Sequence, residues 1–180
     1  MVADGPFDKA SSKMSPGSIV TYVDGTEITP DADLAAIFNN IAGRKTLVAF
    51  TTPEGEKQSE VVVPVTKGTL NDLLYNRWIK QRAEDVNKWS NGRLGYVHIA
   101  SMNDDSFRPI YADIFGKYNN CEGIVIDIRW NGGGRMHEDI EALLTGKKYL
   151  TQEIRGKDVC DMPSRRWNKP SIMVVAEPCY

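Results

Sequence analysis

Apolar residues recur along the chain with two different periods, and the change of period divides the sequence. Between residues 18 and 65 they stand in short blocks bounded by Pro, Gly and Asp, a pattern typical of strands joined by turns. The blocks predict strands over residues 18–23, 46–52 and 59–65. We therefore expect a small β-rich module that ends at about residue 67.

A helix is expected to interrupt this module after its first long strand. Apolar residues with helical spacing predict it over residues 31–40. Thr29 is the expected N-cap, because Pro30 then occupies the first helical position, where proline fits best. Gly43 is the expected left-handed cap at the other end.

The apolar period becomes helical again from residue 69 to residue 90. One stripe with spacings of three and four residues consists of Leu70, Leu73, Leu74, Trp78 and Ile79. The opposite face carries charged residues. The pattern predicts a linker helix over residues 68–91, with no evident binding chemistry.

Beyond residue 92, strand-like and helix-like segments alternate. Strand patterns cover residues 93–99 and 124–128, and helical patterns cover residues 107–118 and 136–144. Further strands are expected after Tyr149. Such alternation predicts a mostly parallel sheet with right-handed crossovers. Together with the β-rich first module, it makes the predicted fold class α+β.

Composition and charge limit the classes of function that are expected. Of the 180 residues, 26% are charged and 41% are hydrophobic, as in ordinary globular proteins. The net charge of -2 does not favour nucleic acid or an anionic membrane surface as a partner. No apolar run is long enough to span a bilayer, and no signal-peptide pattern is present.

Cysteine and histidine do not form a recognisable metal site. Cys121, Cys160 and Cys179 lack the spacing of metal ligands, and His98 and His137 lie far apart in the sequence. No metal ion and no cofactor are therefore expected. Cys179 stays open as a nucleophile, with a plain small residue at a strand end as the favoured alternative.

The most informative stretch is a strand that runs directly into three glycines. Residues 124–128 are β-branched apart from Asp127, as in a strand covered on both faces. Gly132 to Gly134 follow, and a helical pattern starts at Met136. Bare amides near a helix N-terminus suit the stabilisation of an oxyanion, although a tight turn without chemistry is an alternative. Asp127 and Arg129 are expected to form an ion pair or hydrogen bond at the strand end.

These residues also carry a resemblance to a known family. The run from Asp127 to Gly134, Asp-Ile-Arg-Trp-Asn-Gly-Gly-Gly, resembles the strand-and-glycine motif of the tricorn core protease and C-terminal processing peptidase family of serine peptidases. The segment from Gly92 to Ile99 also resembles this family. The resemblance runs from about Pro16 to Tyr180, and it is strongest to the tricorn-type members. The order of turns, strands and helix before residue 67 resembles the PDZ domains of these peptidases.

The resemblance implies a division into domains. Residues 1–67 would be a PDZ-like module whose first strand is not evident, and residues 68–91 a linker helix. Residues 92–180 would be the N-terminal part of an α/β peptidase core with βαβ units, cut before its nucleophile. We therefore expect a fragment of a longer prokaryotic protein, whose compartment stays open between cytoplasm and periplasm.

The resemblance also implies a chemistry. In the family a serine attacks the peptide carbonyl, a histidine takes its proton, and backbone amides hold the oxyanion. By the match, Gly134 supplies one such amide, while Gly132 and Gly133 shape the turn. The serine would follow Tyr180, and the histidine and an orienting glutamate would also lie outside the chain. The fragment alone is therefore expected to be inactive, and no cofactor or metal ion is implied.

Peptides or proteins are the implied substrates. Gln152 and Glu153 correspond to the region of a primary specificity pocket, where the Glu153 carboxylate would favour Lys or Arg; an exposed strand edge is the alternative. The PDZ-like module would bind peptide C-termini or serve as a spacer, and the parent protein would be a homo-oligomer. A non-enzymatic peptide-binding or scaffolding module is the second function kept open.

Overall fold

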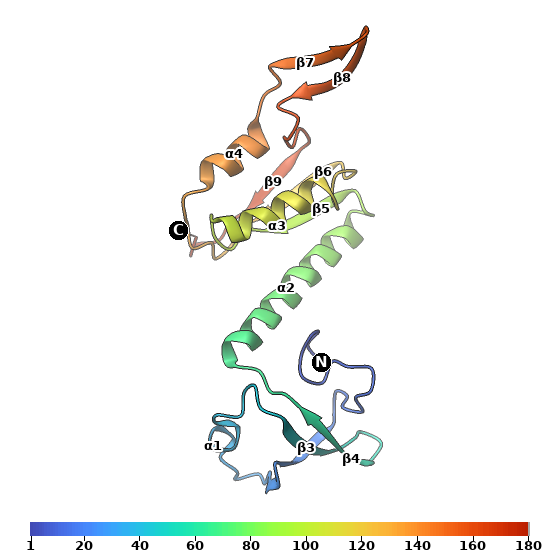
Figure 1. Ribbon diagram of the computed structural model, residues 1–180, viewed down its shortest axis with the longest axis vertical. Coiled ribbons are helices and arrows are strands. Elements are labelled where there is room, and N and C mark those ends of the chain that lie inside the picture. The colour runs from blue at the N-terminus through green and yellow to red at the C-terminus, as the bar shows by residue number, and fades with distance from the viewer. Residues whose placement is uncertain (180) are drawn as a thin grey trace. The chain divides into compact units, whose positions relative to one another are not determined.

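The computed structural model describes residues 1–179 (Figure 1). The chain divides into two compact units, Met1–Trp78 and Ile79–Tyr180. The division falls within α2 (Lys67–Trp89), an unbroken helix where the sequence predicts one. Of the helices in residues 1–179, none has both the length and the apolar composition that a membrane crossing requires.

The first unit is built on a four-stranded antiparallel sheet with the strand order β2–β1–β3–β4. Its strands are β1 (Ile19–Val23), β2 (Thr26–Glu27), β3 (Thr46–Thr51) and β4 (Lys57–Val62). β3 pairs with both β1 and β4 and buries every second side chain, as in a sheet covered on one face. The three long strands that the sequence predicts are present, although the third spans Lys57–Val62 rather than the expected residues 59–65.

The core of the first unit is small. Val48, Phe50 and Val62 are buried, and Phe7, Met14 and Val20 pack against them. The N-terminal segment is tied to the sheet by the Glu60 carboxylate, which accepts the Lys13 N–H at 2.5 Å and the Ser12 hydroxyl at 3.2 Å. Residues before 15, to which the sequence analysis assigned no element, thus help to cover this sheet.

The helix of this unit is shorter than predicted. α1 (Leu34–Phe38) replaces the expected span of residues 31–40, and its N-cap is Asp33 rather than Thr29. The prediction was wrong because the Asp33 side chain accepts two backbone N–H groups of the first turn, at 3.0 and 3.2 Å. The helix also ends well before Gly43, the expected cap.

The second unit contains a parallel three-stranded sheet in the order β5–β6–β9. Its strands are β5 (Leu94–His98), β6 (Gly123–Asp127) and β9 (Ser171–Val174). α3 (Asp104–Phe115) connects β5 to β6, and α4 (His137–Thr145) follows β6. The alternation of strands and helices is therefore confirmed, and with the antiparallel first sheet the fold class is α+β, as predicted.

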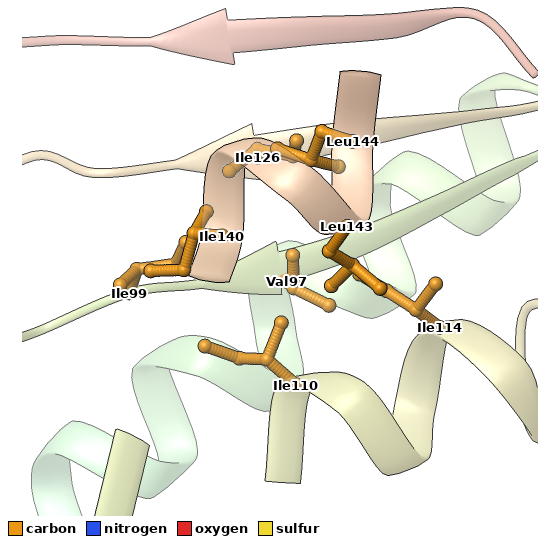
Figure 2. Close-up of a pocket in the computed structure, with 8 residues that line it drawn as sticks. All are labelled: Val97, Ile99, Ile110, Ile114, Ile126, Ile140, Leu143 and Leu144. Atoms are coloured by element: carbon orange, nitrogen blue, oxygen red, sulfur yellow. The ribbon is translucent and has the colours of Figure 1, made fainter. Parts of the chain in front are cut away.

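The core of the second unit is much larger. Its buried members are Val97, Ile99, Ile110, Ile114, Tyr118, Ile124, Ile126, Ile140, Leu143 and Trp167. Figure 2 shows aliphatic side chains from α3, from α4 and from the region of β5 and β6 converging on one another. The void between them has a volume of about 10 Å³. A void this small with apolar lining offers a water molecule no hydrogen-bond partner, so this region is packed core.

A two-stranded antiparallel hairpin lies between α4 and β9 in the chain. It consists of β7 (Leu150–Ile154) and β8 (Lys157–Met162). Arg155 and Gly156 at its tip have φ values of 53° and 76°, as in the type I′ turn that matches the twist of paired strands. Strands were expected after Tyr149, and the structure confirms them.

Candidate active site

The central strand of the parallel sheet, β6, is followed by a tight turn. Ile128, directly after β6, donates its N–H to the Val174 carbonyl of β9 at 2.9 Å, and the Asn131 N–H returns to the Ile128 carbonyl at 3.0 Å. Between them, Trp130 has a φ of 58° and is 58% exposed. A left-handed backbone is strained in a bulky aromatic residue and persists only where the surroundings hold it.

The three glycines then run alongside the segment that follows β5. Gly132 donates its N–H to a carbonyl of this segment at 3.0 Å, and the Met102 N–H donates to the Gly133 carbonyl at 2.8 Å. The Gly133 N–H is held by Asn131 Oδ1 at 2.7 Å. Gly134 is exposed, and its N–H makes no hydrogen bond to any of residues 1–179. Two of the three amides are therefore engaged, and one is left for an outside acceptor.

Peptide geometry fixes the direction of the Gly134 N–H. In a trans peptide, the C=O and the N–H point in opposite directions. The Gly133 carbonyl points at Met102, so the Gly134 N–H of the same peptide points away from the segment after β5. Met102 and Gly134 form an isolated parallel bridge in which the neighbours of Gly134 make the hydrogen bonds. The other side of the turn thus presents a single donor.

The three glycines are not equivalent. Gly134 has a φ of 142°, and a Cβ at this position would overlap the backbone carbonyl of Met102. Gly133 has a φ of 77°, also in the region that favours glycine. A Cβ on Gly132 would lie 3.7 Å from the Ser101 hydroxyl, an ordinary contact. Glycine is required by backbone conformation at the second and third positions only.

Asp127, the last residue of β6, anchors the base of the turn. Its side chain is 1% exposed and accepts the Tyr96 hydroxyl at 2.8 Å. The Arg129 guanidinium donates to the two carboxylate oxygens at 2.6 to 3.1 Å, and the Arg129 backbone N–H donates at 3.0 Å. The expected ion pair at the strand end is confirmed, and it fixes the residue directly before the strained Trp130.

This network shifts two pKa values in opposite directions. Burial alone would raise the pKa of Asp127, but the hydrogen bonds from Arg129 and Tyr96 outweigh it and hold that pKa below its usual value. Burial, and then the hydrogen bond to Asp127, raise the pKa of Tyr96 well above its usual value. Neither group titrates near neutral pH, so the pair suits a structural anchor better than acid–base catalysis.

Two buried polar residues have partners at the turn that the sequence analysis did not find. His98 ends β5, and its Nε2 lies 3.0 Å from the Arg129 carbonyl. Asn131 is 1% exposed, and its Nδ2 donates to the Ile99 carbonyl at 2.7 Å while Oδ1 accepts the Gly133 N–H. An Asn before glycines is a turn signal. Its partner Ile99 lies 32 positions away, however, and the local sequence does not reveal it.

Gln152 and Glu153 lie in β7, at an irregularity in its pairing with β8. Both residues are exposed. Gln152 Oε1 accepts the Cys160 thiol at 3.1 Å. Among residues 1–179, neither side chain has a hydrogen bond or ion pair with the glycine turn.

The last described residues return to this turn. The Cys179 thiol donates to the Ile128 carbonyl at 3.1 Å, and the Ala176 N–H lies 3.3 Å from the same sulfur. The expected nucleophile, after Tyr180, lies outside the described residues. Within residues 1–179 no three His, Cys, Asp or Glu side chains are grouped as metal ligands would be.

Comparison with known proteins finds sequence similarity to peptidases. Residues 93–180 match peptidase family S41. The tricorn protease homolog of Saccharolobus solfataricus is 26% identical over 170 residues, which cover 94% of this chain and 15% of that protein. Tricorn protease homolog 1 of Streptomyces coelicolor is 29% identical over 133 residues, which cover 73% of this chain and 12% of that protein.

Comparison with solved structures finds a similar fold. A crystal structure of the tricorn protease matches with a TM-score of 0.69 and 20% identity, over 90% of this chain and 16% of that chain. The sequence of the tricorn protease of Thermoplasma acidophilum is 23% identical over 157 residues, 78% of this chain and 14% of that protein. The chain thus spans 12% to 16% of the length of these relatives.

Proposed function

We propose that the chain is part of a tricorn-like serine peptidase, which hydrolyses peptide bonds through an acyl-enzyme. The match of residues 93–180 to peptidase family S41 and the similarity to tricorn proteases support this proposal. The Gly134 N–H donates to the oxyanion, and Gly132 and Gly133 shape the turn. One observation carries the proposal. The Gly134 N–H is exposed, has no acceptor among residues 1–179 and points away from the segment after β5.

An amide in this state suits an oxyanion because it is oriented before negative charge develops. The Gly132 and Gly133 amides are satisfied internally, so they keep the turn in place without competing for the same acceptor. The buried Asp127 holds the strand end below them. Loss of one oriented donor of this kind lowers turnover by about 100–1000-fold in other hydrolases.

We place the attacking group on a serine directly after Tyr180, and its general base on a histidine outside this chain. The contact of Cys179 with Ile128 supports this placement, because it brings the end of the described chain to the start of the turn. The serine oxygen bonds to the peptide carbonyl carbon and its proton goes to the base. The carbonyl oxygen becomes the oxyanion. As the intermediate collapses and the C–N bond breaks, the protonated base gives its proton to the leaving amine, and water then hydrolyses the ester.

The proposed domains follow the resemblance. Residues 1–67 are a PDZ-like module, residues 68–91 a linker helix and residues 92–180 the first part of the peptidase core. Peptides or proteins are the substrates, and the exposed carboxylate of Glu153, beside Gln152 in β7, selects basic side chains by charge.

Peptide binding by the first unit is a second candidate function. α1 exposes two apolar side chains, Leu34 at 51% and Phe38 at 48%, and β2 is a short strand at the edge of the sheet. An apolar helix surface and a sheet edge are the elements with which such modules add a peptide strand. Titration with C-terminal peptides, followed by NMR, should shift amide signals in residues 19–38. No shift at millimolar peptide would exclude this function.

Sequencing the codons after Tyr180 tests the peptidase proposal most cheaply. A serine codon directly after Tyr180, followed by helix-opening residues, is the expected result. Protein extended through the downstream segments and the preceding histidine should then cleave peptides, and replacement of that serine by alanine should abolish the cleavage. The 180-residue chain alone should be inactive. Peptide hydrolysis by this chain that disappears in Cys179→Ala would replace the serine mechanism with a thiol mechanism.

A further inference from the structure

The peptide between Gly133 and Gly134 decides which way the proposed oxyanion donor points. On one side it is fixed by the hydrogen bond from the Met102 N–H to the Gly133 carbonyl, at 2.8 Å. Gly133 and Gly134 both have positive φ, 77° and 142°, in regions that glycine enters freely. Two consecutive glycines have little intrinsic preference for one orientation of the peptide between them, so the orientation depends on outside partners.

Asn131 holds the preceding peptide, between Gly132 and Gly133. Its side chain is buried, and its two polar atoms bridge separate segments: Nδ2 donates to the Ile99 carbonyl at 2.7 Å, and Oδ1 accepts the Gly133 N–H at 2.7 Å. Its backbone N–H also closes the turn onto Ile128, at 3.0 Å. The side chain therefore joins the glycine turn to the segment after β5 at a point adjacent to the critical peptide.

Without this bridge, the turn retains fewer constraints. The Gly133 N–H would lose its acceptor, and the Ile99 carbonyl would lose a buried donor. Rotation of the next peptide would then turn the Gly134 N–H towards Met102 and present the Gly133 carbonyl oxygen on the exposed side. A carbonyl oxygen there would repel an oxyanion.

We propose that Asn131 is a positioning residue that locks the Gly133–Gly134 peptide with the Gly134 N–H directed towards substrate. The proposal rests on the peptidase function for its catalytic meaning, but the lock itself is a property of this chain. Asn131 touches neither substrate nor reacting atoms and acts through the glycine amides.

The lock is tested by amide hydrogen exchange and NMR on the full 180-residue chain. In Asn131→Ala, exchange of the Gly133 amide should accelerate by at least tenfold and the Gly134 amide signal should shift. The Gly132 amide should stay within about twofold of wild type. Asn131→Asp keeps an acceptor for the Gly133 N–H but loses the donor to the Ile99 carbonyl, so it should restore only part of the Gly133 protection. Ile114→Val, a core change in the same unit, controls for general destabilisation and should leave all three signals unchanged.

Steady-state kinetics of the longer, active protein provide a second, separate readout. Asn131→Ala should lower kcat by about 10–1000-fold and leave KM within about twofold, because only the transition state uses the oriented amide. Unchanged Gly133 exchange or an unchanged kcat would overturn the lock. If exchange responds as stated but the wild-type longer protein cleaves no peptide, the lock stands and the peptidase function is what fails.

Discussion

The two units of the chain bury very different amounts of apolar surface. In the first unit the buried cluster consists of Val48, Phe50 and Val62, whereas in the second it extends from the parallel sheet to both of its helices. Both units also expose apolar side chains, for example Ile19 at 68% in the first and Ile172 at 62% in the second, so the contrast lies in the size of the buried clusters. We expect the first unit to be the less stable of the two.

The units also differ in how they use buried polar groups. In the first unit Thr46 and Thr52 are buried, and their hydroxyls bond within four positions of the chain, to Arg44 and Glu56. In the second unit the hydrogen bonds of Asp127 and Asn131 reach 31 and 32 positions away. Among the fully buried polar side chains of residues 1–179, those with partners this distant lie at the turn after β6. The position of this turn is therefore fixed by tertiary contacts.

The largest expected effect tests whether the units are separate in stability. Phe50→Ala removes the central side chain of the smaller core and should destabilise the first unit by about 4 kcal/mol. Hydrogen exchange should show loss of protection in β3 and β4, with β5 and β6 unaffected. Ile126→Ala is the matched change in the other core and should give the reverse pattern. Equal loss in both units would show that the two cores unfold together.

The glycine turn provides the next largest effect. Gly134→Ala should lower the free energy of unfolding of the second unit by about 3 kcal/mol, because its φ of 142° is strained for alanine and the added Cβ overlaps the Met102 carbonyl. Gly132→Ala is the control and should stay within about 0.5 kcal/mol. Chemical denaturation measures both. Similar losses in the two variants would contradict the distinction between the glycines.

The buried ion pair should give a smaller effect that depends on pH. Asp127→Asn should destabilise the second unit by about 2 kcal/mol at pH 7, since it leaves Arg129 without its carboxylate. The folded pKa of Asp127 lies below the usual pKa of an aspartate. The ionised carboxylate therefore stabilises the fold above that usual pKa, and this contribution is lost as the pH falls through the folded pKa. The difference between wild type and variant should therefore shrink below about pH 4.

The smallest effect belongs to an ion pair that looks equally good by distance. Arg93 and Glu122 are 2.7 Å apart, close to the 2.6 Å of the Arg129–Asp127 pair, but their side chains are 68% and 61% exposed. Solvent and salt screen such a pair. Arg93→Gln should not change the melting temperature measurably at 0.15 M salt. A loss comparable with that of Asp127→Asn would mean that burial is not what separates the two pairs.

Much of the fold could be predicted because its signals are local. The β-branched run that ends at Asp127 predicts β6, and the alternation around it predicts a parallel sheet. Strands after Tyr149 were also predicted, whereas the hairpin that they form, with Gly156 at its tip, was not. The end of α1 could not be fixed, because Asp33 and Thr29 are both acceptable caps and only the tertiary structure selects one.

The candidate site was predicted only in part, for a related reason. Three glycines after a strand indicate exposed amides, but the sequence does not show which of them is engaged. That depends on Met102 and on the Asn131 side chain, whose partner is distant in sequence. The orientation of a peptide plane is a tertiary property, and no residue type specifies it by itself.

The backbone hydrogen bonds between Met102 and the glycine turn have a consequence for protein engineering. The Met102 N–H donates to Gly133, and its carbonyl accepts the N–H groups of Arg135 and Met136 at 3.0 and 3.1 Å, so its side chain takes no part in these bonds. Side-chain scanning at position 102 would therefore report the packing of Met102 against the core but not these backbone bonds. Proline, or an ester in place of the amide by chemical synthesis, removes the donor itself. Such backbone substitutions are the appropriate way to test a turn that is held by main-chain hydrogen bonds.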